Sequence, residues 1–144
     1  MNILISSCLL GLHCRYAGDE KYQKQVALLS QNHHLIPICP EQMGGLPTPR
    51  PPVERIDGKA MTNTGEDVTA QFVKGAEEVV QLAKLLDCKA AVLKSRSPSC
   101  GCGIIHDGTF SDGLVDGNGF TAERLLREGI LVVSENNLSD LLDR

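Results

Sequence analysis

The sequence predicts an α/β fold of one domain, residues 1–144, with a mainly parallel four-stranded sheet flanked by helices in a Rossmann-like arrangement. Two observations indicate this fold class. Short apolar segments alternate along the chain with amphipathic ones, which is the pattern of strands connected by crossover helices. The length of 144 residues suits one core, and 42% hydrophobic with 22% charged residues is ordinary for a globular protein. A small hairpin insertion completes the prediction.

The apolar segments expected to be strands cover residues 2–6, 34–38, 89–93 and 130–133. The predicted helices cover residues 21–30, 66–86, 120–127 and, as a single last turn, 138–142. Gly129 is expected to end the third helix, because glycine is favoured just past a helix C-terminus.

The longest predicted helix, residues 66–86, is supported by its apolar spacing. One stripe recurs at every third or fourth position, at Val68, Phe72, Ala76, Val79, Ala83 and Leu86. Thr64 precedes Asp67 by three residues, so we expect a capping box in which Asp takes the usual place of Glu.

The insertion is expected between residues 39 and 62. Residues 39–52 hold five prolines and two glycines, and an irregular stretch of that length in a compact domain is usually functional. Asp57-Gly58 then separates the segments 53–56 and 59–62, which is the signature of a tight hairpin.

Composition argues against several functional classes without excluding a local basic patch. The net charge of −4 and 3% aromatic residues, with no Trp, disfavour a nucleic-acid-binding surface. The apolar run at residues 3–5 is interrupted by Ser6, Ser7 and Cys8, so we expect no signal peptide, and no segment approaches the ~20 apolar residues of a membrane span. We expect a cytoplasmic protein, in which six cysteines serve as ligands, nucleophiles or buried thiols rather than disulfides.

Three cysteines are placed by the predicted strands at one edge of the sheet. Cys8 follows the first strand, Cys39 ends the second and Cys100 lies in the loop after the third. Ligands of parallel sheets bind beyond the carboxyl ends of the strands. Cys88 precedes its strand and should be a buried thiol at the opposite edge. Two further cysteines, Cys14 and Cys102, lie in the right loops but one step from the strand ends.

The residues themselves leave four interpretations of these thiols open. They could bind zinc, hold an iron–sulfur cluster with one iron free of protein ligands, form an exchange pair such as Cys8 with Cys14, or merely pack. Glu41 follows Cys39 by two residues and could serve as a general acid or base, the alternative being a solvated charge. The four histidines, His13, His33, His34 and His106, are expected not to be ligands.

Four sequence blocks resemble the thiouracil desulfidase family in its stand-alone, single-domain form. They are SCLLG at residues 7–11, CPE at 39–41, GGLPTPR at 44–50 and SPSCG at 97–101. The resemblance covers nearly the whole chain, with the blocks in the family's order.

The resemblance implies a 4Fe-4S cluster held by Cys8, Cys39 and Cys100, with the fourth iron open to the sulfur of a thiolated pyrimidine. It further implies that Glu41 activates water for attack on the thiocarbonyl carbon and that Ser97 assists by hydrogen bonding. The products would be a uracil-type base and sulfide, formed without electron transfer. Cys102 departs from the family pattern and could compete as a ligand or relay sulfide.

The expected substrate is thiouracil, a thiouridine nucleotide or thiouridine in tRNA. The residues that we expect to contact it are Ser99, Lys94, Arg15, Gly45 and Arg50. For tRNA, a basic rim could contact phosphates through Arg15, Lys21, Lys24, Arg50 and Arg55. The alternatives to an enzyme of this kind are a non-enzymatic iron–sulfur or zinc-binding module that handles sulfide, and a thiol redox protein.

Overall fold

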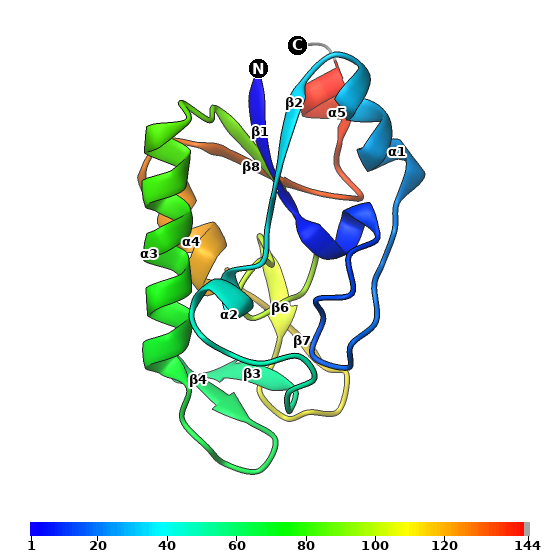
Figure 1. Cartoon of the computed structure of the whole chain (residues 1–144). Coiled ribbons are helices and arrows are strands. Elements are labelled where there is room, and N and C mark those ends of the chain that lie inside the picture. The colour runs from blue at the N-terminus through cyan, green and yellow to red at the C-terminus, as the bar shows by residue number, and fades with distance from the viewer. Residues whose placement is uncertain (143–144) are drawn as a thin grey trace.

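The computed structural model describes residues 1–142 and has the predicted α/β architecture (Figure 1). Four parallel strands form the main sheet in the order β2-β1-β5-β8. Their bounds lie within one residue of the predicted ones and are Asn2–Ser6 for β1, His34–Ile38 for β2, Ala90–Leu93 for β5 and Leu131–Ser134 for β8. The predicted fold class is confirmed.

The two central strands, β1 and β5, are buried on both faces. Ile3, Leu4 and Ile5 are fully buried, and every residue of β5 is at most 1% exposed. A strand covered on both faces has no polar side, which explains why both segments are continuous apolar runs in the sequence. Because all four strands are parallel, their carboxyl ends meet at one edge of the sheet.

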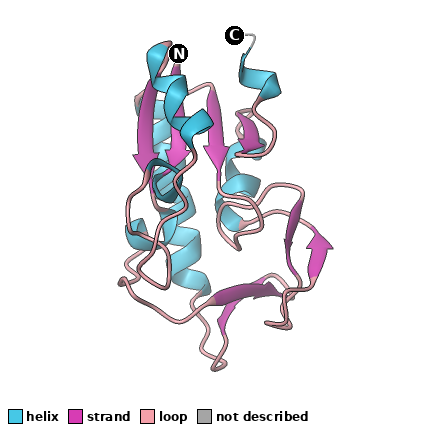
Figure 2. Cartoon of the chain, turned by 90° about the vertical axis from the view of Figure 1, so that its right-hand side faces the viewer, coloured by secondary structure: helices cyan, strands magenta, loops and turns pink. Residues whose placement is uncertain are grey.

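Helices cover both faces of the sheet (Figures 1 and 2). Ile5 packs in a cluster with apolar residues of α1 and α5, and Leu4 packs on the opposite face with residues of α3 and α4. The helices span Lys24–Ala27 for α1, Thr69–Leu85 for α3, Phe120–Arg127 for α4 and Ser139–Leu142 for α5.

Two hairpins lie beyond the carboxyl edge of the main sheet (Figures 1 and 2). The predicted one is formed by β3 (Val53–Ile56) and β4 (Lys59–Thr62). A second hairpin, of β6 (Ile104–His106) and β7 (Leu114–Asp116), was not predicted, because its strands have three residues each and are largely exposed. The short helix α2 (Pro40–Met43) also lies within a stretch that was predicted to be irregular.

Helix α1 is shorter than the predicted helix over residues 21–30. The N–H groups of Lys21 and Gln23 donate to carbonyls of the loop after β1, which keeps residues 21–23 extended. The chain continues from α1 into a 3₁₀ turn, Leu28–Gln31.

Helix α3 begins at Thr69 instead of residue 66, and the predicted capping box does not form. The Thr64 hydroxyl hydrogen-bonds that of Thr62 at 3.1 Å, whereas Asp67 accepts the N–H of Thr69 at 2.9 Å. Val68 donates its N–H to a carbonyl of β4. The residues before α3 are therefore held extended against the hairpin.

The short helix α2 lies directly against α3 because two glycines face each other across the contact. A Cβ on Gly44 would overlap the carbonyl oxygen of Gln71, and a Cβ on Gly75 would overlap that of Pro40. Any side chain at either position would push the two helices apart. This contact fixes α2, which carries Glu41, relative to the sheet.

Within residues 1–142, no helix combines the length and apolar character needed to cross a membrane.

Candidate functional site

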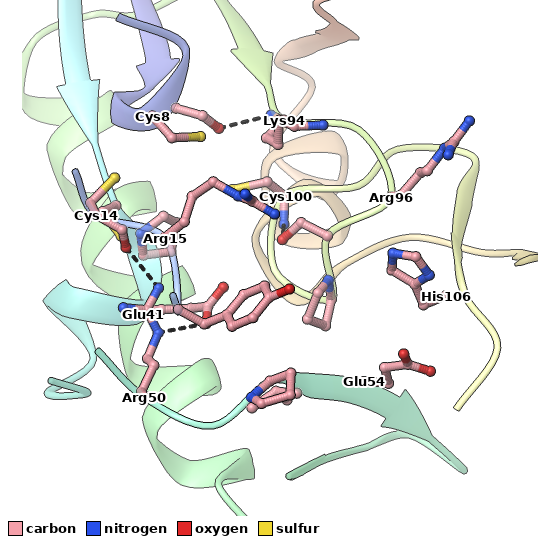
Figure 3. A pocket seen from close by; sticks show the side chains of 18 of the residues that line it. Cys8, Cys14, Arg15, Glu41, Arg50, Glu54, Lys94, Arg96, Cys100 and His106 are labelled. Carbon is pink, nitrogen blue, oxygen red and sulfur yellow. Dashed lines mark hydrogen bonds and ion pairs between the residues drawn. The ribbon is translucent and has the colours of Figure 1, made fainter. Parts of the chain in front are cut away.

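A cavity of about 470 Å³ opens at the carboxyl edge of the main sheet (Figure 3). The loops after β1, β2 and β5 form one part of its wall, and the two hairpins form the other. This is the place where ligands bind in parallel α/β sheets.

The cavity contains the three cysteines that were expected to meet. Cys8, Cys39 and Cys100 all line it, together with a fourth thiol, that of Cys14. All four are buried or half-buried. The structure therefore brings together three residues that are far apart in the sequence. It also places Cys14 beside them, a residue that the positions of the predicted strands neither included in the site nor excluded from it.

The two remaining cysteines lie elsewhere. Cys88 is buried at the opposite edge of the sheet, beside the start of β5, as predicted. Cys102 packs among the apolar residues of the α3 and α4 side, with its sulfur 4.0 Å from the carbonyl oxygen of Val132. It does not line the cavity.

Cys8 and Cys39 are each positioned by a short helical segment that follows a strand. Cys8 lies in the 3₁₀ turn Ser7–Leu10 directly after β1. Cys39 is the residue before α2, and Pro40 begins that helix, a position where proline's missing N–H is harmless. These two thiols are thus held on rigid elements.

Cys100 is positioned by Ser97. The Ser97 hydroxyl oxygen accepts hydrogen bonds from the N–H groups of Ser99 at 3.1 Å and Cys100 at 3.0 Å. The Ser97 carbonyl accepts the N–H of Gly101 at 2.8 Å. A Cβ on Gly101 would crowd that carbonyl, so this glycine permits the turn itself.

The pKa values of three cavity thiols, those of Cys14, Cys39 and Cys100, are raised above the ordinary thiol value. Burial raises the pKa of Cys100 to about 12. The contact with Cys39 lowers the pKa of Cys14, but the contact with Cys8 and burial outweigh it and raise that pKa to about 11. The neighbouring Cys14 and burial raise the pKa of Cys39 well above its usual range. Metal ligation requires thiolates, so metal binding here would release protons.

Glu41 lines the cavity and forms an ion pair with Arg50. The guanidinium Nε lies 3.1 Å from Oε1 of Glu41, and the Arg50 side chain is only 3% exposed. We predicted that Arg50 contacts the substrate, but four of its five N–H donors are directed to protein acceptors. Because its side chain is almost fully buried, Arg50 forms part of the cavity wall.

The other predicted substrate contacts divide into two groups. Lys94 and Arg15 line the cavity, and each is in an ion pair, with Glu135 at 2.9 Å and Asp19 at 2.6 Å respectively. Ser99 and Gly45 do not line the cavity. The geometry therefore does not support the prediction that they contact the substrate.

Ser99 is 1% exposed, and its hydroxyl is 2.9 Å from that of Thr121 at the start of α4. Gly45 is exposed in the loop after α2 and has a φ of 100°, so it serves the turn. Ser97, in contrast to Ser99, lines the cavity.

The expected basic rim is not assembled. Lys21 and Lys24 do not line the cavity. Arg55 lies over the ring of Phe120 at 4.1 Å and donates to the carbonyl of Asn118 at 2.8 Å. These cations do not form a continuous surface around the opening.

The hairpins contribute polar residues that sequence reasoning did not select. Glu54 on β3 is buried, and its Oε1 accepts the N–H groups of Gly108 at 2.9 Å and Phe110 at 3.0 Å, which joins the two hairpins. His106 lines the cavity, and its Nδ1 is buried without a partner among the described residues. In Figure 3 they lie opposite Cys14. The sequence held one signal for this part of the site, the predicted β3–β4 hairpin. Its position relative to the cavity depends on tertiary contacts, which the sequence pattern does not show.

Backbone strain is concentrated in the same part of the wall. Three residues other than glycine that line the cavity have positive φ, namely Arg96 at 67°, Phe110 at 57° and Asp112 at 65°. Such conformations cost about 1–3 kcal/mol each and cluster at functional sites.

The donor set fits an iron–sulfur cluster. Thiolates from three loops are soft ligands, which suit iron–sulfur clusters or zinc and not hard cations. Within residues 1–142, no three His, Cys, Asp or Glu side chains lie close enough together to hold a single metal ion. A cluster distributes its cysteines over separate irons, so ligands spaced around a cavity suit it.

Fold and cavity define the class as an α/β protein with a thiol-lined site at the carboxyl edge of a parallel sheet. A family model described as 2-thiouracil desulfurase matches residues 3–137, and the chain belongs to this family. The resemblance seen in the four sequence blocks is thereby confirmed.

Two relatives extend this assignment. The chain is 41% identical over 150 residues to the uncharacterised protein YbbK of Bacillus subtilis (strain 168), covering 97% of this chain and 99% of YbbK. It also resembles a solved structure described as the 4Fe-4S-dependent thiouracil desulfidase TudS, with a TM-score of 0.91 and 42% identity. That match covers 98% of this chain and 95% of TudS.

Proposed function

We propose that this protein is a hydrolytic desulfidase that replaces the sulfur of a thiolated uracil by oxygen, with a 4Fe-4S cluster held by Cys8, Cys39 and Cys100. Membership of the 2-thiouracil desulfurase family and the likeness to TudS support the reaction class. The observation that carries the proposal is the presence of these three thiols and Glu41 in one cavity.

The residues of the chain suit a hydrolysis. Bound in the cavity, a cluster with one iron free of protein ligands supplies a Lewis acid for the substrate sulfur. Glu41 accepts a proton from the water that attacks the thiocarbonyl carbon. The Ser97 oxygen already accepts two N–H groups, so its own proton is left to donate to the substrate. A C–O bond forms, the C–S bond breaks, and sulfide leaves without any change of oxidation state.

The cavity supports a substrate larger than the free base. A volume of about 470 Å³ lies in the roughly 300–1,000 Å³ range of pockets that hold drug-sized ligands, which favours a substrate larger than one pyrimidine ring. On the side opposite Cys14, the Glu54 carboxylate can accept a hydrogen bond from a ribose hydroxyl, and the His106 ring nitrogens can bond a ribose or phosphate oxygen. A thiouridine nucleotide therefore fits better than thiouracil, and the dispersed lysines disfavour tRNA.

The test uses protein reconstituted with iron and sulfide under anaerobic conditions. Iron and sulfide content, the cluster absorption and the formation of oxo base and sulfide are measured. We expect Cys39→Ser to lose the cluster and the activity. The matched control is Cys88→Ser, which alters a buried thiol at the opposite edge and should keep both.

Glu41→Gln separates an enzyme from a module that only handles sulfide. We expect this variant to keep its cluster and to lose about 10²–10⁴-fold in turnover, the usual contribution of a general base. Unchanged sulfide release would instead favour the non-enzymatic module.

Comparing kcat/KM for thiouracil, thiouridine, its 5′-monophosphate and thiolated tRNA identifies the substrate. A steep salt dependence is expected only for tRNA.

A further inference from the structure

The side chain of Arg50 is enclosed by acceptors. Its Nε donates to Oε1 of Glu41 at 3.1 Å, and its Nη1 donates to the Thr48 hydroxyl at 2.8 Å and the Pro47 carbonyl at 3.2 Å. Its Nη2 donates to the Cys14 carbonyl at 2.9 Å. Each of its nitrogens is engaged and 3% of the side chain is exposed, so four of the five N–H donors of Arg50 are already used by the protein.

These contacts join three segments around the cysteines. The Cys14 carbonyl also accepts a weak hydrogen bond from the Cys39 thiol at 3.8 Å, and the backbone N–H of Arg50 donates to the carbonyl of Tyr16 at 2.8 Å. Arg50 thus connects the loop after β1 with the start of α2. Among the carboxylates of residues 1–142, only that of Glu41 forms an ion pair with the buried guanidinium of Arg50.

The pair also determines how Glu41 is presented. A guanidinium is planar and directs each N–H along a fixed line, so a carboxylate bonded to it has a fixed orientation. Only Oε1 of Glu41 is held this way. No hydrogen bond to Oε2 is formed by the residues that the structure describes, and Glu41 lines the cavity. The second oxygen is therefore the one available to a water or substrate.

We propose that Arg50 is a positioning residue that acts on the reaction through Glu41, by fixing the direction in which the free carboxylate oxygen faces the cavity. The inference rests on the proposed function, because it assumes that Glu41 is the base. It differs from the role expected from the sequence, in which Arg50 contacts the substrate. A catalytic group displaced by about 1 Å can lose roughly 10²-fold in rate, so such a role is measurable.

The first experiment is a double-mutant cycle with Arg50→Gln and Glu41→Gln in the reconstituted protein. We expect Arg50→Gln to lower kcat by about 10²-fold with KM and iron content unchanged. In the Glu41→Gln background the same change should lower kcat no further. Arg50→Lys should restore part of the loss, and Arg124→Gln, a surface arginine on α4, should have no effect.

Three results would overturn the inference. Loss of iron in proportion to activity would mean that Arg50 only braces the cysteine loop. A rise in KM at constant kcat would mean that it contacts the substrate. An equal loss of kcat in the Glu41→Gln background would mean that it acts independently of Glu41. An inactive wild-type protein would instead refute the proposed function.

A second readout needs neither cluster nor turnover. In metal-free protein the Nε–H proton of Arg50 should give a sharp NMR signal that exchanges slowly, because it is buried and bonded to a carboxylate. Glu41→Gln should shift that signal. A signal that exchanges freely with water in the wild-type protein would show that the pair does not hold Glu41 and would also refute the inference.

Discussion

The hydroxyl oxygen of Ser97 lies 3.0 Å from the backbone nitrogen of Cys100 and accepts its hydrogen bond. The same oxygen accepts the N–H of Ser99 at 3.1 Å. The serine that faces the cavity therefore also shapes the turn that carries a proposed cluster ligand. Its structural and chemical contributions can be separated by substitution.

Ser97→Ala should destabilise the metal-free protein by about 1–2 kcal/mol, because two N–H groups lose their acceptor. It should also reduce iron retention, because the turn no longer holds Cys100. Ser97→Thr keeps the hydroxyl and should behave like the wild type in both respects. Urea unfolding and iron content after gel filtration measure the two effects.

Ser99→Ala is the matched control. Its hydroxyl pairs with Thr121 outside the cavity, so the variant should lose stability and keep its iron. Equal iron loss in both alanine variants would contradict the assignment of Ser97 as the residue that shapes the site.

Gly75→Ala should destabilise the protein by about 1–3 kcal/mol, because its Cβ would overlap the carbonyl of Pro40. Since α2 must then move away from α3, Cys39 and Glu41 should move with it, and iron binding should weaken. Thermal unfolding and reconstitution measure both effects. Lys74→Ala, on the exposed side of the same helix, should change neither, and a silent Gly75→Ala would show that the two helices do not touch.

Glu135 should make stability depend on pH. Burial raises the pKa of its carboxyl, but Lys94 and the N–H of Ser95 outweigh burial and hold it below the usual 4.5. A lowered pKa in the folded state stabilises the fold above the unfolded pKa, and this contribution is lost as pH falls through the folded value. Glu135→Gln should therefore be less stable by about 1–3 kcal/mol at pH 7.

The difference between wild type and Glu135→Gln should shrink as pH falls from about 4.5, the ordinary pKa, through the lower pKa of the folded wild-type carboxyl. Urea unfolding of the metal-free proteins over a pH series measures it. Glu66→Gln, at an exposed carboxylate, serves as the control. A difference that stays constant down to acid pH would show that the Lys94 pair contributes nothing.

Cys102→Ser should bind as much iron as the wild type, because Cys102 packs on the α3 and α4 side and does not line the cavity. Cys100→Ser, two residues earlier, should lose most of it. Iron and sulfide analysis after anaerobic reconstitution distinguishes them. If Cys102→Ser lost its iron and Cys100→Ser kept it, Cys102 and not Cys100 would be the ligand.

The sequence predicted most of the main sheet because its signals are local. Continuous apolar runs mark β1 and β5, and their alternation with helices gives the parallel order of the fold class. The same reasoning placed Cys8, Cys39 and Cys100 at one edge, and their shared cavity agrees with it. Roles in catalysis and cluster binding stay predictions, which the experiments above address.

What the sequence could not predict depends on contacts between distant segments. Residues 21–23 and the start of α3 are extended because their N–H groups donate to distant segments, the turn after β1 and the strand β4, which no periodicity reveals. The second hairpin is too short for an apolar pattern, yet it brings His106 to the cavity. Glu135 reaches Lys94 only because β8 pairs with β5.

By itself, the sequence determined the sheet, the edge of the site and the family, since these depend on local patterns and short blocks of residues. Only the tertiary structure decided how the charged residues are used. Arg50 was expected to bind the substrate, but its neighbours accept four of its five N–H donors and direct its Nε to Glu41. A side chain's role follows from the partners that surround it, and those partners come from separate parts of the chain.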